Sequence, residues 1–226
     1  MSDAMSGGNS EPPPIPELEV DPNPLLDLWA FVSYLPSPLA RIATSAAVIE
    51  SLDRAAAAPL VTDDGVRQRI RALLRAGGFK PTGRSKPASE YLLAAAADAP
   101  LRSINAVVDA GNAVSLHSGV PISVVDLARV EPPLAIRVGP VDSKYVFNPS
   151  GQVIDVEGLV CLFDRAGPCA NAVKDAQRSK TDGDTRAVLG LLWGTAELPG
   201  RTEAALGWYA ELLAGMEMAI ERIYPR

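Results

Sequence analysis

The sequence predicts a single α+β domain, with helices gathered in the first half and strands in the second. Three helical patterns precede residue 100, a series of short apolar runs separated by turn residues follows, and an amphipathic run closes the chain. Such segregation is typical of α+β domains rather than of alternating α/β folds. At 226 residues and 47% hydrophobic, the chain suffices for one packed core and is short for two full domains.

Residues 1–24 are predicted to form a disordered, proline-rich arm. They carry Gly-Gly, three consecutive prolines and acidic residues, but no periodic apolar face. A segment of this composition cannot bury enough apolar surface to offset the entropy lost on ordering. We therefore expect the folded domain to span residues 25–226.

Helical patterns dominate the first half of that domain. A dense apolar patch at residues 25–32 is predicted to pack in the core, and a helical run follows over about 39–58. Residues 63–75 have apolar side chains at helical spacing, Thr62 or Asp63 as a possible N-cap, and Gly77-Gly78 to end the helix. Pro87 fits the first turn of a further helix that ends near residue 97.

The stretch 103–127 is the most informative part of the chain. Its apolar runs are predicted to be short buried elements cut by Gly111, Gly119 and Pro121. A buried polar group without a hydrogen bond costs about 1–3 kcal/mol. The polar residues of this stretch must therefore find partners or face a cavity; they are Asp109, Asn112, Ser115, His117, Ser123 and Asp126.

Strand patterns follow at residues 134–138, 144–147, 153–156, 158–163 and 185–193, with a hairpin turn at 148–151 and a loop at 164–169. A long amphipathic helix is predicted over 201–224, because its apolar residues recur on one helical face.

Composition excludes several classes of protein. The net charge of −6 argues against indiscriminate nucleic-acid coating, so any RNA contact must be local, and no DNA partner is predicted. Two cysteines, no secretory pattern and no apolar run near the roughly 20 residues of a membrane span predict a cytoplasmic protein. One histidine cannot build a His/Cys zinc cage, so no metal is predicted. Serine-hydrolase, dinucleotide and ATP-binding motifs are absent.

A basic stretch stands out against this acidic background. No acidic residue occurs among residues 67–86, which hold a series of arginines and lysines. On charge alone, a solvated helix face and a phosphate-binding edge are equally good interpretations. The candidate cations are Arg67, Arg71, Arg75, Lys80, Arg84 and Lys86.

The order "INAVVDAGNAVSLHSGVPISVVDL" followed by "LAIRVG" resembles the B3/B4 domain of the phenylalanyl-tRNA synthetase β subunit. Residues 78–93 and 174–194 resemble the lead-in and closing segments of free-standing members, so the resemblance covers about 66–195. It implies a layered sheet-and-helix (β/β/α) domain, here with an extra N-terminal helical segment. The implied function is tRNA binding and editing of mischarged aminoacyl-tRNA, without a cofactor.

The resemblance also implies a pocket. Asn112 stands where the family has its pocket asparagine, Gly119 and Pro121 match the turn that shapes the wall, and Thr185 matches near the closing strand. Ser123 replaces a pocket histidine, and Leu191 occupies the place of the glutamate that reads a tyrosyl hydroxyl, so tyrosine specificity does not transfer. The predicted pocket consists of Asn112, Ser115, Gly119, Pro121, Ser123 and Thr185. Lys174, Arg178 and Lys180 are predicted to form a basic lip over it.

No catalytic residue is assigned. His117 and Cys169 are better explained as a packed or surface residue and an ordinary thiol, and Asp109 and Asp126 as structural carboxylates. An activated ester needs only a positioned water and a stabilised oxyanion. The leading hypothesis is a trans-editing aminoacyl-tRNA deacylase whose partner is the tRNA acceptor end. Its alternatives are a non-catalytic RNA or aminoacyl-ligand binding module, or a small-molecule binder unrelated to tRNA; the oligomeric state is left open.

Overall fold

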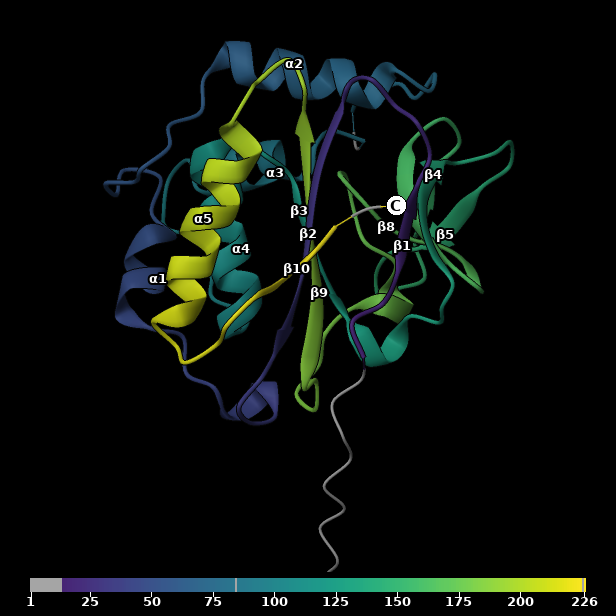
Figure 1. Ribbon diagram of the computed structural model, residues 1–226. Coiled ribbons are helices and arrows are strands. Elements are labelled where there is room, and N and C mark those ends of the chain that lie inside the picture. The colour runs from purple at the N-terminus through teal and green to yellow at the C-terminus, as the bar shows by residue number, and fades with distance from the viewer. Residues whose placement is uncertain (1–13, 84, 225) are drawn as a thin grey trace, which may run out of the picture.

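The computed structural model describes residues 14–83, 85–224 and 226, and its architecture is mixed α+β, as predicted (Figure 1). The helices are α1 (Ala46–Ser51), α2 (Asp64–Arg75), α3 (Ala88–Ala95), α4 (Ala106–Ser118) and α5 (Arg201–Ala214). The strands are β1 (Leu18–Val20), β2 (Leu26–Tyr34), β3 (Ile122–Asp126), β4 (Leu134–Val138), β5 (Lys144–Val146), β6 (Val153–Asp155), β7 (Val160–Asp164), β8 (Gly167–Asn171), β9 (Ala187–Thr195) and β10 (Glu221–Ile223).

A central sheet with strand order β10-β2-β9-β3 separates two hydrophobic cores. All its strand pairs are antiparallel, and β2 and β9 pair along their whole length, from Leu26 opposite Thr195 to Tyr34 opposite Ala187. In Figure 1, α4 and α5 lie against one face of this sheet and the second sheet lies on the other. Every residue of β9 is buried, as expected for a strand that is covered on both faces.

The second sheet has strand order β1-β4-β7-β8, and β5 and β6 form a separate hairpin. The core between the two sheets contains Leu18, Ile136 and Leu162 from the second sheet and Leu189 and Leu191 from β9. The strand alternation of β9 sends neighbouring residues to opposite sides, so Val188 and Leu192 belong to the helix-side core.

The two sheets are joined at both sides of the sandwich. At one side, the main chain of Arg226 bonds β1, with its nitrogen donating to Leu18 O at 3.1 Å and its oxygen accepting from Val20 N at 3.2 Å. At the other side, Val125 of β3 forms an isolated antiparallel bridge with Lys180, which follows the 3-10 turn Gln177–Ser179 after β8. The inter-sheet core is therefore enclosed by main chain on both sides.

Helix α4 forms across the glycine that was expected to interrupt it. Asn105 caps its start by accepting from Val108 N at 3.0 Å, and Gly119 ends it in the left-handed region with φ of 72°. Gly111 lies within the helix, and its lack of a side chain allows α5 to pack closely there. A Cβ at this position would lie 2.9 Å from Tyr209 Oη. The prediction that Gly111 divides two elements is wrong, whereas the turn at Gly119 and Pro121 is confirmed.

Several predicted boundaries need correction. The segment 1–24, predicted to be a disordered arm, contains β1. Leu18 of this strand is 1% exposed and pairs with Leu134 of β4. Residues 1–13 of the predicted arm lie outside the described part of the chain. The helical run at 39–58 reduces to a single 3-10 turn and α1. The loop at 164–169 contains the start of β8, and the helix predicted over 201–224 ends at Ala214, where the chain turns back to pair β10 with β2.

Candidate functional site

A connected set of polar side chains lies between the two sheets, where an apolar seam would be expected. We call it the inter-sheet network; its members are Ser123, Tyr145, Asn171, Asp175 and Trp193. Trp193 Nε1 donates to Ser123 Oγ at 2.9 Å, and Ser123 Oγ donates to Asp175 Oδ1 at 2.7 Å. Ser123 is fully buried on β3. The network thus ties the central sheet to the segment that follows β8.

Asn171 organises the turn after β8. Its Oδ1 accepts from Val173 N at 2.8 Å and from Lys174 N at 3.0 Å, while its Nδ2 donates to Tyr145 Oη. Tyr145 Oη in turn donates to Lys174 O at 2.5 Å. The hairpin, the turn after β8 and the central sheet therefore meet in one set of hydrogen bonds.

The carboxyl group of Asp175 is electrostatically unusual. Burial raises its pKa to about 6, against the opposing effects of the Ser123 and backbone hydrogen bonds and of the Lys180 ammonium. Burial also lowers the pKa of Lys180, although Asp175 opposes that shift, and the Lys180 ammonium donates to Phe147 O at 2.6 Å. A buried carboxyl that titrates near neutrality is typical of functional sites, although ion-pair networks produce it as well.

An open groove of about 540 Å³ lies beside the network, between the hairpin and the segment that precedes α3. We call it the hairpin groove; it is lined by Ser85, Phe147, Gln152, Val153, Ile154, Asp155 and Lys174. The Lys174 ammonium lies 4.2 Å from the centre of the Phe147 ring and 5.4 Å from that of Tyr91 on α3. A cation placed against aromatic faces is held there by electrostatic attraction to the rings.

A second groove, of about 570 Å³, lies between α2 and α3. We call it the α2–α3 groove; its charged residues are Arg54, Arg67, Arg71 and Lys86, with Asp64 and Glu90. Arg67 pairs with Asp64, and Arg71 forms a two-pronged ion pair with Glu90 at 2.5 Å. Four cations face two carboxylates, so the groove keeps a positive surplus in a protein of net charge −6.

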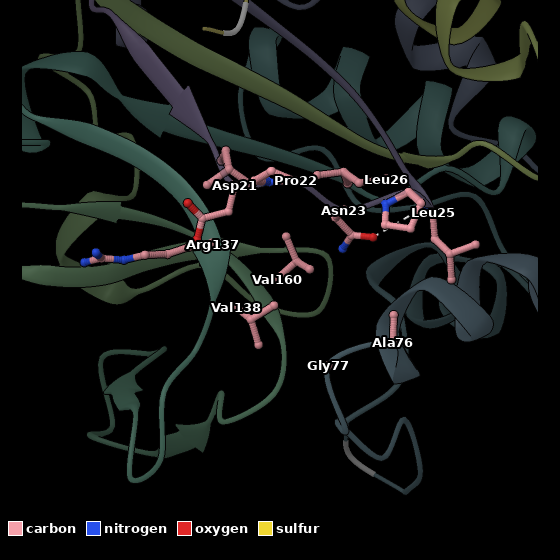
Figure 2. A pocket seen from close by; sticks show the side chains of 12 residues that line it. Asp21, Pro22, Asn23, Leu25, Leu26, Ala76, Gly77, Arg137, Val138 and Val160 are labelled. Carbon is pink, nitrogen blue, oxygen red and sulfur yellow. Dashed lines mark hydrogen bonds between the residues drawn. The ribbon is translucent and has the colours of Figure 1, made fainter.

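A third groove, of about 440 Å³, contains none of the predicted site residues (Figure 2). Val138 and Val160 stand in its middle, the loop before β2 forms one wall, and Ala76 and Gly77 after α2 form another. The Arg137 side chain extends away from the groove, and its guanidinium lies 4.3 Å from the centre of the Phe163 ring. This groove is mainly apolar and offers little chemistry.

The structure does not bring the six predicted pocket residues into one cavity. Ser123 faces the second sheet, whereas Ser115 lies on α4, which packs on the opposite face of β3 beside Val124. Ser115 Oγ is buried without a hydrogen-bond partner among the described residues, and Asn112 is half-buried on the same helix.

The remaining three predicted pocket residues have internal structural partners. Thr185 Oγ1 donates to Asp126 Oδ2 at 2.7 Å, which fixes the end of β3. A Cβ on Gly119 would lie 2.4 Å from Thr62 Oγ1, and the Pro121 carbonyl accepts from Trp193 N at 2.9 Å. A single pocket made of all six residues therefore does not form.

The nine predicted RNA-binding cations lie in different environments. Arg67, Arg71 and Lys86 line the α2–α3 groove, and Lys174 lines the hairpin groove. Arg75 and Lys80 are exposed, and Arg84 lies outside the described residues. Arg178 forms a two-pronged ion pair with Asp164 at 2.6 and 2.7 Å, and Lys180 is held by Phe147 O, so both serve internal contacts.

The other chemically notable residues are structural. His117 is buried, with Nε2 3.0 Å from Ser51 O and its ring edge-on to Trp208. Asp109 accepts from Thr44 Oγ1, Ser103 Oγ and Ile104 N, close to the start of α4. Both cysteines are buried, and burial raises the pKa of the Cys169 thiol to about 12, which disfavours the reactive thiolate.

Sequence reasoning named Ser123 but not the residues around it. Asn171, Tyr145 and Trp193 belong to separate strands, so their meeting depends on tertiary pairing that spacing does not reveal. One usable signal was Trp193. A tryptophan inside a predicted buried strand needs a partner for its indole N–H, and a buried polar residue had to supply it.

Comparison with models of known protein families identifies one family. A family model described as the B3/4 domain matches residues 79–191, half of the chain. This range contains every member of the inter-sheet network except Trp193 and all the residues that line the hairpin groove. A crystal structure of an N-terminal fragment of the phenylalanyl-tRNA synthetase beta subunit from Pyrococcus horikoshii is similar at 14% sequence identity and a TM-score of 0.44. The match covers 51% of this chain and 41% of that one. No curated protein matches.

Proposed function

Because this chain belongs to the B3/4 domain family, we propose that it binds tRNA and hydrolyses the ester of mischarged aminoacyl-tRNA. The observation that supports RNA binding best is the positive surplus of the α2–α3 groove in an otherwise acidic protein. Affinity for a polynucleotide comes mainly from cations that neutralise phosphates. A local basic groove allows that contact without general nucleic-acid binding.

The proposed reaction needs no covalent intermediate. The oxygen of a water molecule attacks the ester carbonyl, the bond between that carbon and the ribose oxygen breaks, and the ribose oxygen takes up a proton that the water gives up. The products are the free amino acid and a tRNA with a ribose hydroxyl. Placement of the ester and of the water supplies much of the acceleration. We assign no catalytic residue, and the proposal requires neither metal nor cofactor. The proposed function implies a cytoplasmic protein. As a separate finding, no helix in the described ranges is long and apolar enough to cross a membrane.

RNA binding is tested by removing charge from the α2–α3 groove. The variant Arg54→Gln/Arg67→Gln/Lys86→Gln spares Arg71, whose pairing with Glu90 joins α2 to α3. We expect weaker tRNA binding and a shallower dependence of the dissociation constant on salt, because fewer counterions are released. A matched control is Arg41→Gln/Arg165→Gln/Arg186→Gln, three exposed arginines that line none of the grooves described above. Equal losses in the two variants would contradict a local RNA contact.

Hydrolysis is tested separately, by incubating the protein with a panel of mischarged tRNAs and following loss of the labelled amino acid. Release that depends on one or a few amino acids supports the deacylase. Binding without release for the whole panel would leave a non-catalytic RNA-binding module. Absence of tRNA binding at low salt would remove both.

One observation favours a small-molecule binder as the second candidate. Two of the four cations in the α2–α3 groove already pair with carboxylates of the same groove, and this pairing weakens the electrostatic attraction of the groove for a polyanion. A groove of alternating charge also suits a small zwitterion. Thermal shift assays with free amino acids and nucleotides, run beside the tRNA titration, separate the two candidates.

A further inference from the structure

Lys174 is held at both of its main-chain polar groups. Its nitrogen donates to Asn171 Oδ1 at 3.0 Å, and its oxygen accepts from Tyr145 Oη at 2.5 Å. The two side chains also bond each other. A residue in a turn ordinarily leaves its main chain partly to water, so fixing both groups by two side chains that also bond each other is a substantial restraint.

The next residue along the chain is fixed just as firmly. The Asp175 carboxylate accepts from Ser123 Oγ at 2.7 Å and from Asn171 N at 3.2 Å, and Ser123 is in turn fixed by Trp193. Lys174 therefore lies between Asn171 and Asp175, both of which are fixed by hydrogen bonds. Its side chain leaves this turn toward the hairpin groove, where the ammonium lies over the Phe147 ring.

The network also has a cost that an apolar seam would avoid. Burying hydroxyl, amide and carboxyl groups is favourable only when all are paired, and burial of the Asp175 carboxyl raises its pKa because the charged form loses its contact with water. A set of apolar side chains would close the same seam without that cost. The polar network instead gives the turn that carries Lys174 a defined geometry, because hydrogen bonds fix it at particular atoms.

We propose that the inter-sheet network is a positioning device for Lys174, which holds the ammonium in the hairpin groove where it contacts a phosphate of bound RNA. The identity of the ligand rests on the proposed function; the positioning does not. In this arrangement Lys174 is the residue that touches the ligand. Ser123, Tyr145, Asn171 and Asp175 act through it.

Positioning is measured without RNA, by NMR of protein labelled with carbon-13 at the lysine ε position. The Lys174 signal, identified by its loss in Lys174→Arg, should be shifted upfield by the aromatic ring currents of Phe147 and Tyr91. Tyr145→Phe and Asp175→Ala should move it toward the position of exposed lysines. Thr185→Val removes a buried hydrogen bond elsewhere and should leave it unchanged. A Lys174 signal that does not respond to Tyr145→Phe overturns the proposal.

The RNA contact is measured by a double-mutant cycle on tRNA binding. Lys174→Gln should weaken binding several-fold, Tyr145→Phe should weaken it by a smaller factor, and the double variant should bind no more weakly than Lys174→Gln alone. Strictly additive losses would mean that Tyr145 acts independently of Lys174, which overturns the positioning role. If the parent protein fails to bind tRNA, the proposed function falls, while the NMR measurement still decides the positioning.

Discussion

At the scale of single residues, Asp175 links stability to pH with a definite sign. Its pKa in the folded protein, about 6, lies above the ordinary value of 3.8, so the folded state holds the proton more tightly than the unfolded chain does. The contribution of this carboxyl to stability is therefore fully present below about pH 3.8 and is lost as the pH rises through about 6. A shift of this size corresponds to at most about 3 kcal/mol.

The variant Asp175→Asn removes that titration and keeps the shape of the side chain. We expect the free energy of unfolding of the variant, relative to the parent, to rise by about 2–3 kcal/mol between pH 4 and pH 7. Urea unfolding at four pH values measures it, and the difference between the two proteins cancels groups that titrate in both. Asp98→Asn, which removes an exposed carboxylate, is the matched control. A difference that stays constant over this range would contradict the shift.

At the scale of elements, β1 is ordered by packing although the composition of the surrounding segment predicts disorder. Leu18 is 1% exposed and lies in the inter-sheet core, whereas Glu19, the next residue, is exposed. Leu18→Ala should lower the free energy of unfolding by about 2–5 kcal/mol, the usual cost of a large-to-small change in a core. Glu19→Ala should change it by less than about 0.5 kcal/mol. Chemical denaturation of the two variants checks this, and equal small effects would mean that β1 is not part of the core.

Deletions give a second measurement on the same element. Removal of residues 1–20 takes away β1 and should lower the melting temperature strongly. Removal of residues 1–13, whose composition cannot bury apolar surface, should leave it nearly unchanged. Destabilisation by the shorter deletion would contradict the prediction, made from composition, that these residues do not contribute to the core.

The elements that the sequence predicts well are those defined by local signals. Helix α2 begins after the Asp63 cap, whose Oδ1 accepts from Val66 N at 2.7 Å, and the hairpin turn at 148–151 joins β5 to β6 as expected. β1 and β10 escaped prediction because each is three residues long and exists only through a remote partner, β4 for one and β2 for the other. The inter-sheet network escaped for the same reason, since its members come from four strands and a turn.

At the scale of the whole molecule, the central sheet couples the two hydrophobic cores. Val188 and Leu189 are neighbours on β9, yet Val188 packs against the helices and Leu189 against the second sheet. Each core also contains a tryptophan: Trp193 lies between the sheets and Trp208 lies on the helix side. Because β9 contributes to both cores, neither is expected to persist when the other is disrupted.

The chain should therefore unfold as one cooperative domain, as its length and composition predict. Val188→Ala and Leu189→Ala each remove methyl groups from one core only. Both should shift a single transition to lower denaturant concentration, by an amount that corresponds to about 1–4 kcal/mol, with tryptophan fluorescence and far-ultraviolet circular dichroism still coinciding. Two independent units would respond differently, since each substitution would then move only one of two transitions and the two probes would separate. If the transitions measured by the two probes coincide in both variants, the inter-sheet network and the helix layer belong to the same folding unit. Separate transitions in either variant would mean that the two cores unfold as distinct units.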